Sequence, residues 1–404
     1  MGLVSTTLWP KQQVATFLTH FVPYTLGAMP PESLPATALF VPVGANPARV
    51  FGLDAETRAC RLAAKAGMDC ARSAEPGRAA VLADLGFAWD PAWLTAIRDR
   101  PGSVLMLGER AVLANVPAGQ DASAIVAAME SAAPWRGEGF DRIDADSAEL
   151  SYAELRKRDR PFVLPLDTAD PEPVERAAYD ASYKGVTDVL TLYLWRKPAF
   201  HLTRWAARAG MSPNQVTLIG AILCVATFFF WMQGNYWPGI ASAFGFMVLD
   251  TVDGKLARCT GQSSHWGNIF DHGLDLVHPP FWWWAWANGL NYRGDPFEPV
   301  YEALIILAIV IGYMVQRAIE GIFMRKYGMH IHVWRPIDSK FRLVTARRNP
   351  NMVILVVALI CGRPDMGLEL VALWTLVSIN FHAVRLAQAN AAAERGRVPV
   401  SWLA

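Results

Sequence analysis

Long apolar segments fill the second half of the chain, beginning near Met211. A helix needs about 20 predominantly apolar residues to cross the hydrocarbon core of a bilayer. The fifth segment, 350–361, is short and has to be extended to about 363. The pattern predicts an α-helical integral membrane bundle of six transmembrane helices, at roughly 213–233, 236–258, 266–289, 301–324, 350–363 and 367–388.

The first half, residues 1–180, has a different pattern. Its apolar runs are short and charged residues lie between them, so no run is long enough to span a membrane. Ala38–Val43 and Ser103–Leu107 predict buried strands, whereas Ala55–Ala66 and Ala122–Ala132 predict helices. Strands that alternate with helices are typical of α/β layer folds. We therefore expect a soluble α/β domain that precedes the membrane bundle.

Two further segments complete the predicted organisation. Residues 181–210 form a linker, and within it the basic stretch Trp195–Arg208 predicts an amphipathic helix that lies on the membrane surface. An ordinary connecting helix is the alternative. Residues 391–404 follow the last predicted span as a tail.

Composition supports a membrane protein. Hydrophobic residues make up 53% of the 404 residues, charged residues 18%, and the mean hydropathy is +0.20. Many of the 16 tryptophans lie near apolar runs, where interfacial aromatic residues are expected. The net charge of +1 gives no overall field that would favour nucleic acid. The five cysteines show no metal-binding spacing, so we expect ordinary thiols, and the N-terminus shows no signal-peptide pattern.

Loop charges predict the orientation in the membrane. The loop at 325–349 carries seven Lys and Arg residues, whereas the loops at 234–239, 290–300 and 362–366 together carry two. Cytoplasmic loops are enriched in Lys and Arg. The bundle is therefore predicted to lie in the inner membrane of the cell, with the 325–349 loop on its cytoplasmic side. Six spans then place both termini and the soluble domain on the same side.

Four acidic residues lie at helical spacing in the second and third predicted spans. Asp250 and Asp253 are three residues apart, and Asp271 and Asp275 are four apart, so each pair lies on one face of its helix. One buried Asp can be a structural hydrogen-bonding group, but four carboxylates repel one another and are costly to desolvate. Divalent cations would neutralise them, and oxygen ligands favour Mg²⁺ or Mn²⁺, with two ions expected.

These residues form the pattern D-x2-D-G-x2-A-R-x8-G-x3-D-x3-D, which resembles the signature of the CDP-alcohol phosphotransferase (phosphatidyltransferase) family. The resemblance covers residues 195–390. It implies a metal-dependent attack of an acceptor hydroxyl on the β-phosphate of a CDP-alcohol, with release of CMP, in phospholipid or phosphodiester synthesis. It also implies a homodimer.

The resemblance assigns roles by position. Asp250, Asp253 and Asp271 would hold the metal ions together with Asp275, which would also be the catalytic base. The CDP moiety would contact Gly254, Ala257, Arg258 and Gly267. Asn214 and Thr217, at the start of the first span, could also touch the nucleotide, or could serve as a helix cap and a buried hydrogen-bonding group.

The basic loop offers a candidate site for the second substrate. Four cations near its end could bind the phosphate of a polar acceptor such as an inositol phosphate, or could only attract lipid headgroups. These residues are Lys340, Arg342, Arg347 and Arg348. A lipid acceptor and either a CDP-diacylglycerol or a soluble CDP-alcohol donor remain open.

The first half also resembles a known family. The order LFVPV, a polar turn and RVFGLDAETRACRLAAKAGM is similar to the opening of cytidylyltransferases, which are fused to this membrane family in di-myo-inositol phosphate phosphate synthesis. The expected glycine-rich loop is replaced by GANPARV, and Glu109 is a candidate for the acidic metal site. This departure implies a nucleotidyltransferase-like fold whose catalysis is degenerate, with a regulatory or substrate-guiding role.

Three alternatives to a single transferase activity follow from the same residues. An ion-coupled transporter would also need buried carboxylates, although it does not explain Arg258 and the glycine spacing. A catalytically inactive scaffold does not explain the intact motif. A bifunctional enzyme would retain an active cytidylyltransferase in its first half.

Overall fold

The computed structural model describes residues 38–75, 77–148, 150–152, 157–183, 185–262 and 265–403. The side chains of residues 150–152, 157–159, 265, 266, 268, 271 and 272 lie outside this description. All the elements described below belong to one compact unit, Ala38–Ala404.

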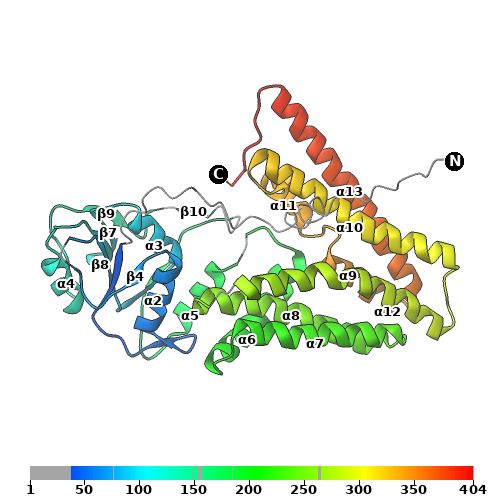
Figure 1. Ribbon diagram of the computed structural model, residues 1–404, viewed down its shortest axis with the longest axis horizontal. Helices are drawn as coiled ribbons and strands as arrows, with labels where there is room; N and C mark the ends of the chain where they lie inside the picture. Colours follow the sequence, from blue (N-terminus) through cyan, green and yellow to red (C-terminus); the bar gives the residue numbers. More distant parts are fainter. Residues whose placement is uncertain are drawn as a thin grey trace, which may run out of the picture. The chain divides into compact units, whose positions relative to one another are not determined.

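The part from residue 38 to 165 alternates strands with short helices (Figure 1). Asp54 caps the first of these helices, and Asp90 followed by proline begins the second, as helix N-termini favour. The elements are β1 Leu39–Val43, β2 Arg49–Val50, β3 Leu53–Asp54, α2 Ala55–Lys65, β4 Asp69–Cys70, β5 Ala80–Asp84, β6 Phe87–Trp89, α3 Pro91–Arg98, β7 Ser103–Leu107, β8 Arg110–Val116, α4 Ser123–Glu130, β9 Asp141–Asp144, β10 Leu150–Tyr152, β11 Lys157–Asp159 and β12 Val163–Pro165.

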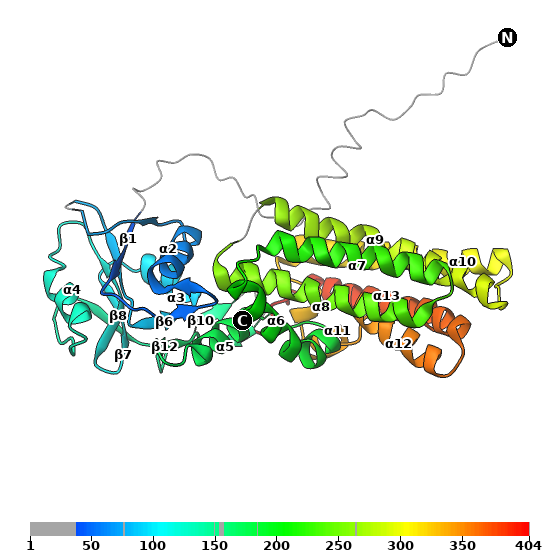
Figure 2. The same cartoon turned by 90° about the horizontal axis from the view of Figure 1, so that it is seen from below.

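A mixed six-stranded sheet of order β4-β1-β5-β8-β7-β9 forms the centre of this part. Strand β1 is parallel to β4 and β5, and β7 is parallel to β9, whereas β8 runs antiparallel to both of its neighbours. Side chains alternate between the two faces, as the period of a strand requires. Phe40 and Val81 pack with α2 and α3 on one face, and Val41 and Leu82 pack with α4 on the other. Figure 2 shows α2 and α4 on opposite sides of the sheet, which confirms the predicted α/β architecture.

Helices predominate in the described part of the chain from Glu172 to Glu394 (Figures 1 and 2). They are α5 Glu172–Ala181, the π-helical turn η1 Leu190–Leu194, α6 Arg196–Arg208, α7 Pro213–Met232, α8 Tyr236–Thr260, α9 His265–Arg293, α10 Pro299–Tyr327, the 3₁₀ turn η2 Ile331–Val333, α11 Pro336–Arg342, α12 Arg348–Ile360 and α13 Pro364–Glu394.

Three of the described helices, α7, α10 and α13, are long and apolar enough to cross a membrane. Large apolar side chains are exposed along them, such as Ile222, Leu307 and Leu373, which a soluble surface would seldom carry as a continuous band. Helices α8 and α9 have the expected length but contain the acidic motif. The predicted fifth span is too long, because α12 ends at Ile360 after 13 residues, and six complete spans are not established.

The predicted surface helix is present as α6. Ala199, Phe200 and Thr203 on one face are buried, whereas Trp205 on another face is 62% exposed. This amphipathic pattern agrees with the prediction, while the contact with lipid stays a prediction. The predicted tail is partly ordered against the basic loop, because the Trp402 backbone N–H donates to the Val333 carbonyl at 3.1 Å.

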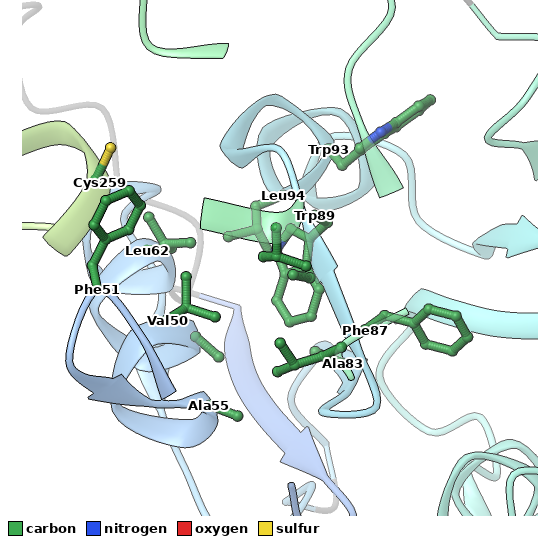
Figure 3. Packing of buried hydrophobic residues seen from close by; sticks show 14 of the residues in the cluster. Val50, Phe51, Ala55, Leu62, Ala83, Phe87, Trp89, Trp93, Leu94 and Cys259 are labelled. Atoms are coloured by element: carbon green, nitrogen blue, oxygen red, sulfur yellow. The ribbon is translucent and has the colours of Figure 1, made fainter. Parts of the chain in front are cut away.

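The buried core of the α/β part extends to the C-terminal end of α8, which carries Asp250 and Asp253. Cys259 of α8 belongs to the same buried cluster as Phe51 and Leu62 (Figure 3). Arg61 and Lys65 of α2 donate to the carbonyls of Thr260 and Ala257, at 3.3 and 3.2 Å. Basic side chains are favourable at a helix C-terminus, where carbonyl groups lack intrahelical partners. The first part of the chain therefore stabilises the end of the helix that carries half of the acidic motif.

The expectation of five ordinary thiols is wrong for Cys60 and Cys70, which form a disulfide. Cys60 lies on α2 and Cys70 on β4, and the turn between these two elements brings their Cα atoms to 5.5 Å. The spacing of ten residues matches no disulfide framework in the sequence, so the pairing depends on the fold.

Candidate active site

Helices α8 and α9 place the acidic motif. Helix α8 ends at Gly261, whose φ of 72° is the left-handed conformation that glycine adopts at helix C-termini. The chain then turns back into α9, which carries Asp271 and Asp275. The side chain of Asp271 lies outside the described residues. Asp250, Asp253 and Asp275 are described, and Asp250 and Asp275 converge on one cation.

That cation is the guanidinium of Arg348, the first residue of α12. Its Nη2 donates to Oδ2 of Asp250 at 2.6 Å, and its Nη1 donates to Oδ1 of Asp275 at 2.7 Å. The Arg348 side chain is 14% exposed, that of Asp250 19% and that of Asp275 48%. The guanidinium also lies over the ring of Phe246, 4.8 Å from its centroid. Asp250 of α8 and Asp275 of α9 therefore lie close enough to share one positive group.

Among the three motif acids whose side chains are described, Asp253 is the most buried, at 4% exposure. Its Oδ2 accepts a hydrogen bond from the Thr217 hydroxyl at 2.6 Å, and its Oδ1 accepts one from the Gly254 N–H at 2.5 Å. These donors fix the orientation of the carboxylate. Carboxylate oxygens held in this way, with a positive group already attracted between two of them, fit the donor set that Mg²⁺ and Mn²⁺ prefer.

Thr217 thus reaches the site through Asp253. Asn214 is exposed at the second position of α7, and the helix is capped instead by Ser212, which forms a capping box with Gln215. The capping interpretation of Asn214 is therefore wrong, and that of a buried hydrogen-bonding group fits Thr217.

Glycine 254 lies directly against the arginine of the motif. A Cβ at Gly254 would stand 3.2 Å from Nη2 of Arg258, closer than most Cβ contacts. Lys255 is buried beside the rings of Tyr179 and Tyr183, with its Nζ 3.0 Å from the centroid of the Tyr183 ring. Ala257 is partly buried and Gly267 lies in the first turn of α9. The motif positions other than the acids thus lie at the end of α8 and the start of α9.

The four cations of the basic loop do not form one cluster. Lys340 lines a pocket of about 370 Å³ between α11, the segment before η1 and the C-terminal tail. Arg347 pairs with Glu320 of α10, and Arg348 pairs with the motif acids. Arg342 is buried and its charge acts on Asp188.

Asp188 binds Asn349, the residue that follows Arg348 in α12. Asn349 Nδ2 donates to Oδ1 of Asp188 at 3.0 Å. Burial raises the pKa of Asp188, but the Thr191 N–H and the charge of Arg342 outweigh burial and hold this pKa below its usual value. Three consecutive residues, 347–349, therefore contact three separate parts of the molecule.

One group of residues missed by sequence reasoning is Glu320, His332 and His382. Their ligand atoms lie within 4.8 Å of one another, the spacing of a candidate metal site among the described residues. Arg347 Nη2, however, lies 2.7 Å from both oxygens of Glu320, and Arg317 Nη1 lies 3.2 Å from one of them.

Two arginines thus surround a single carboxylate in this group. Burial and the nearby Arg347 lower the pKa of His332 well below its usual value, against the opposing effect of Glu320. A divalent cation would add charge to a buried region that is already positive. We interpret the group as a structural ion network, which only the tertiary fold could reveal.

The segment after β1 was the expected triphosphate loop. Its Ala48 N–H donates to Asn46 Oδ1, and the Phe51 N–H donates to Glu175 Oε1 at 2.8 Å. Glu109 is exposed in the turn between β7 and β8, where it pairs with Arg136 at 2.9 Å. The N–H of Ala48 within this segment and that of Phe51 next to it are therefore used within the chain.

Comparison with known proteins gives a family. The family model for CDP-alcohol phosphatidyltransferase matches residues 210–346. Archaetidylinositol phosphate synthase of Pyrococcus horikoshii is 36% identical over 184 residues, which are 45% of this chain and 87% of that protein.

Two further relatives match over shorter regions. Phosphatidylinositol phosphate synthase of Streptomyces avermitilis is 34% identical over 28% of this chain, and cholinephosphotransferase 1 of Gallus gallus is 31% identical over 30% of it. The matches cover 48% and 38% of those two proteins, less than half of each.

Among solved structures, that of Mycobacterium tuberculosis phosphatidylinositol phosphate synthase with CDP-DAG bound aligns with 47% of this chain and 94% of its own. The TM-score is 0.38 at 15% identity. The motif, the apolar helices and the relative matched over most of its length agree. The chain is a member of the CDP-alcohol phosphatidyltransferase family, a membrane enzyme that acts as a CDP-alcohol phosphotransferase.

Proposed function

We propose that Asp250, Asp253, Asp271 and Asp275 hold two divalent metal ions, Mg²⁺ or Mn²⁺, and that this site transfers a substituted phosphate from a CDP-alcohol to a hydroxyl. The observation that carries the proposal is the convergence of Asp250 and Asp275, from two helices, on a single cation. Bound metal ions would supply charge neutralisation at the phosphate oxygens.

Asp275 is the proposed base. Its side chain is 48% exposed, against 19% for Asp250 of the same motif, so an acceptor can approach it. Its carboxylate takes the proton of the acceptor hydroxyl as the new P–O bond forms at the β-phosphorus. The bond from this phosphorus to the bridging oxygen breaks, and CMP leaves with that oxygen.

The nucleotide is proposed to lie at the end of α8 and the start of α9, with Asn214 of α7 at its edge. Gly254 allows the CDP backbone to approach the helix closely, and Arg258 supplies a positive charge for its phosphates. Ala257 and Gly267 leave room beside them. Thr217 contributes by holding Asp253.

An inositol phosphate is the proposed acceptor, and a lipid-linked CDP-alcohol the proposed donor. Two of the relatives are named as synthases of inositol phosphate lipids, whereas the third is a cholinephosphotransferase. Arg348 stands beside the motif acids, Arg347 precedes it in the chain, and Lys340 and Arg342 belong to the same loop. They would bind the acceptor phosphate only after exchanging their present acidic partners for it.

The bundle is proposed to cross the inner membrane six times, as a homodimer, with both termini and the active site in the cytoplasm. The excess of Lys and Arg in the loop at 325–349 supports this orientation. The α/β part is proposed to guide or regulate the transferase rather than to activate CTP. Its contacts with the carbonyls of Ala257 and Thr260 support that role.

A donor and acceptor matrix tests the transferase. Purified protein with Mg²⁺ or Mn²⁺ should release CMP from a CDP-alcohol only when a matching acceptor is present, and Asp253→Asn should abolish this release. Absence of CMP release across a panel of lipid and soluble CDP-alcohols would contradict the proposal. Consumption of CTP in the same assay would contradict the assignment of the α/β part.

A further inference from the structure

Arg348 occupies a special position in the carboxylate site. It is supplied by α12, outside the two helices that carry the motif and two residues beyond the region matched by the family model. Its two terminal nitrogens contact acids on different helices, Asp250 at 2.6 Å and Asp275 at 2.7 Å. The guanidinium is therefore a bridge between α8 and α9.

The acids that Arg348 bridges are the ones that a metal ion would need. Bidentate or bridging contacts of arginine with carboxylates are short, strong and geometrically specific. A divalent ion bound by Asp250 and Asp275 needs lone pairs of the same carboxylates, and it repels a guanidinium that stays close to them. Both cations cannot keep their full set of contacts with the two acids.

We propose that Arg348 is a positioning residue that acts as the built-in counter-cation of the carboxylate site, and that a divalent metal displaces its guanidinium from Asp250, Asp275 or both. This inference rests on the proposed function, which puts metal ions at these acids. Arg348 holds α8 and α9 in register and keeps their carboxylates from repelling one another. Metal binding then couples to release of the α12 side chain.

If Arg348 instead supported the metal ligands, its loss would change the metal affinity in the opposite direction. A side chain that only supports metal ligands from outside strengthens metal binding, and its loss typically weakens affinity by about 10-fold to 100-fold. A competing cation weakens metal binding, and its loss strengthens affinity. The sign of the change therefore separates the two roles.

Manganese titration followed by electron paramagnetic resonance tests this in purified protein without any CDP-alcohol. We expect Arg348→Gln to bind Mn²⁺ about tenfold more tightly than the unmodified protein or better, equivalent to about 1.4 kcal/mol. Arg348→Lys should fall in between, since one ammonium keeps the charge but cannot bridge both acids. Arg363→Gln is the control, because it removes an arginine that pairs with a carboxylate outside the motif, Asp365, and its Mn²⁺ affinity should change little.

Thermal unfolding gives a second readout. With EDTA, Arg348→Gln should melt below the unmodified protein, because Asp250 and Asp275 are no longer bridged. Adding Mn²⁺ should raise the melting temperature of Arg348→Gln by more than it raises that of the unmodified protein. Equal or weaker Mn²⁺ affinity in Arg348→Gln would overturn the inference, as would an equal gain in Arg363→Gln. If Mn²⁺ fails to bind the unmodified protein, or binds equally to Asp253→Asn, the proposed metal site itself fails instead.

Discussion

The acidic motif and the Glu320 network are two neighbouring ion clusters with opposite balances of charge. In the motif, Asp250 and Asp275 share the single Arg348. In the network, Arg317 and Arg347 share the single Glu320. An excess of buried carboxylates raises the energy of the folded protein until cations bind, whereas a carboxylate with two arginines is already compensated. The first cluster is suited to binding, and the second is suited to holding α10 against the basic loop.

The largest expected effect falls on activity at the first cluster. Asp275→Asn should reduce the rate of CMP release by about 10²-fold to 10⁴-fold, the range that general-base catalysis contributes. Its melting temperature should fall modestly, because Arg348 loses the half-exposed acid of its bridge. Steady-state kinetics and thermal unfolding of the same preparation measure both. A variant with normal CMP release would show that Asp275 is not the base.

The second cluster should respond in stability first. Glu320→Gln leaves two partly buried arginines, Arg317 and Arg347, without this carboxylate, and breaking a buried ion pair costs up to about 3 kcal/mol. Thermal unfolding in detergent should show a clear loss of stability. Glu109→Gln, which removes an exposed pair with Arg136, should leave the melting temperature unchanged. Equal behaviour of these two variants would refute the contrast between the clusters.

A smaller effect is expected at the nucleotide end of α8. Gly254→Ala adds a Cβ 3.2 Å from the Arg258 guanidinium and should displace it, so the KM for the CDP-alcohol should rise several-fold with little change in stability. Gly273→Ala in α9 is the control, since a Cβ there meets no atom within 4 Å. If both substitutions change the KM equally, Gly254 has no special relation to the nucleotide.

The sequence was most informative where local spacing decides the outcome. Short apolar runs located β1 and β7, and the spacing that puts Asp250 and Asp253 on one face of a helix does not depend on distant residues. Segment length was less reliable, because α12 begins at the polar Arg348 and ends at Ile360, just before Gly362 in the left-handed conformation. The basic loop could not be resolved into separate contacts from sequence, since each of its cations selects a partner from another helix.

Pairings between distant residues were beyond the sequence for the same reason. Nothing near His332 or His382 indicates that Glu320 lies between them, and nothing near Cys60 selects Cys70. Such contacts are set by how helices and strands stack, and they carry no periodic signal of their own.

The three consecutive contacts of residues 347–349 make the start of α12 sensitive to register. Each residue of an α-helix is rotated by about 100° from the one before it. A residue inserted just before Arg347 would move Arg347 toward the position that faces Asp250 and Arg348 toward the one that faces Asp188. Length changes between Ala346 and Asn349 should therefore be damaging, because a single residue would disconnect three anchor points at once.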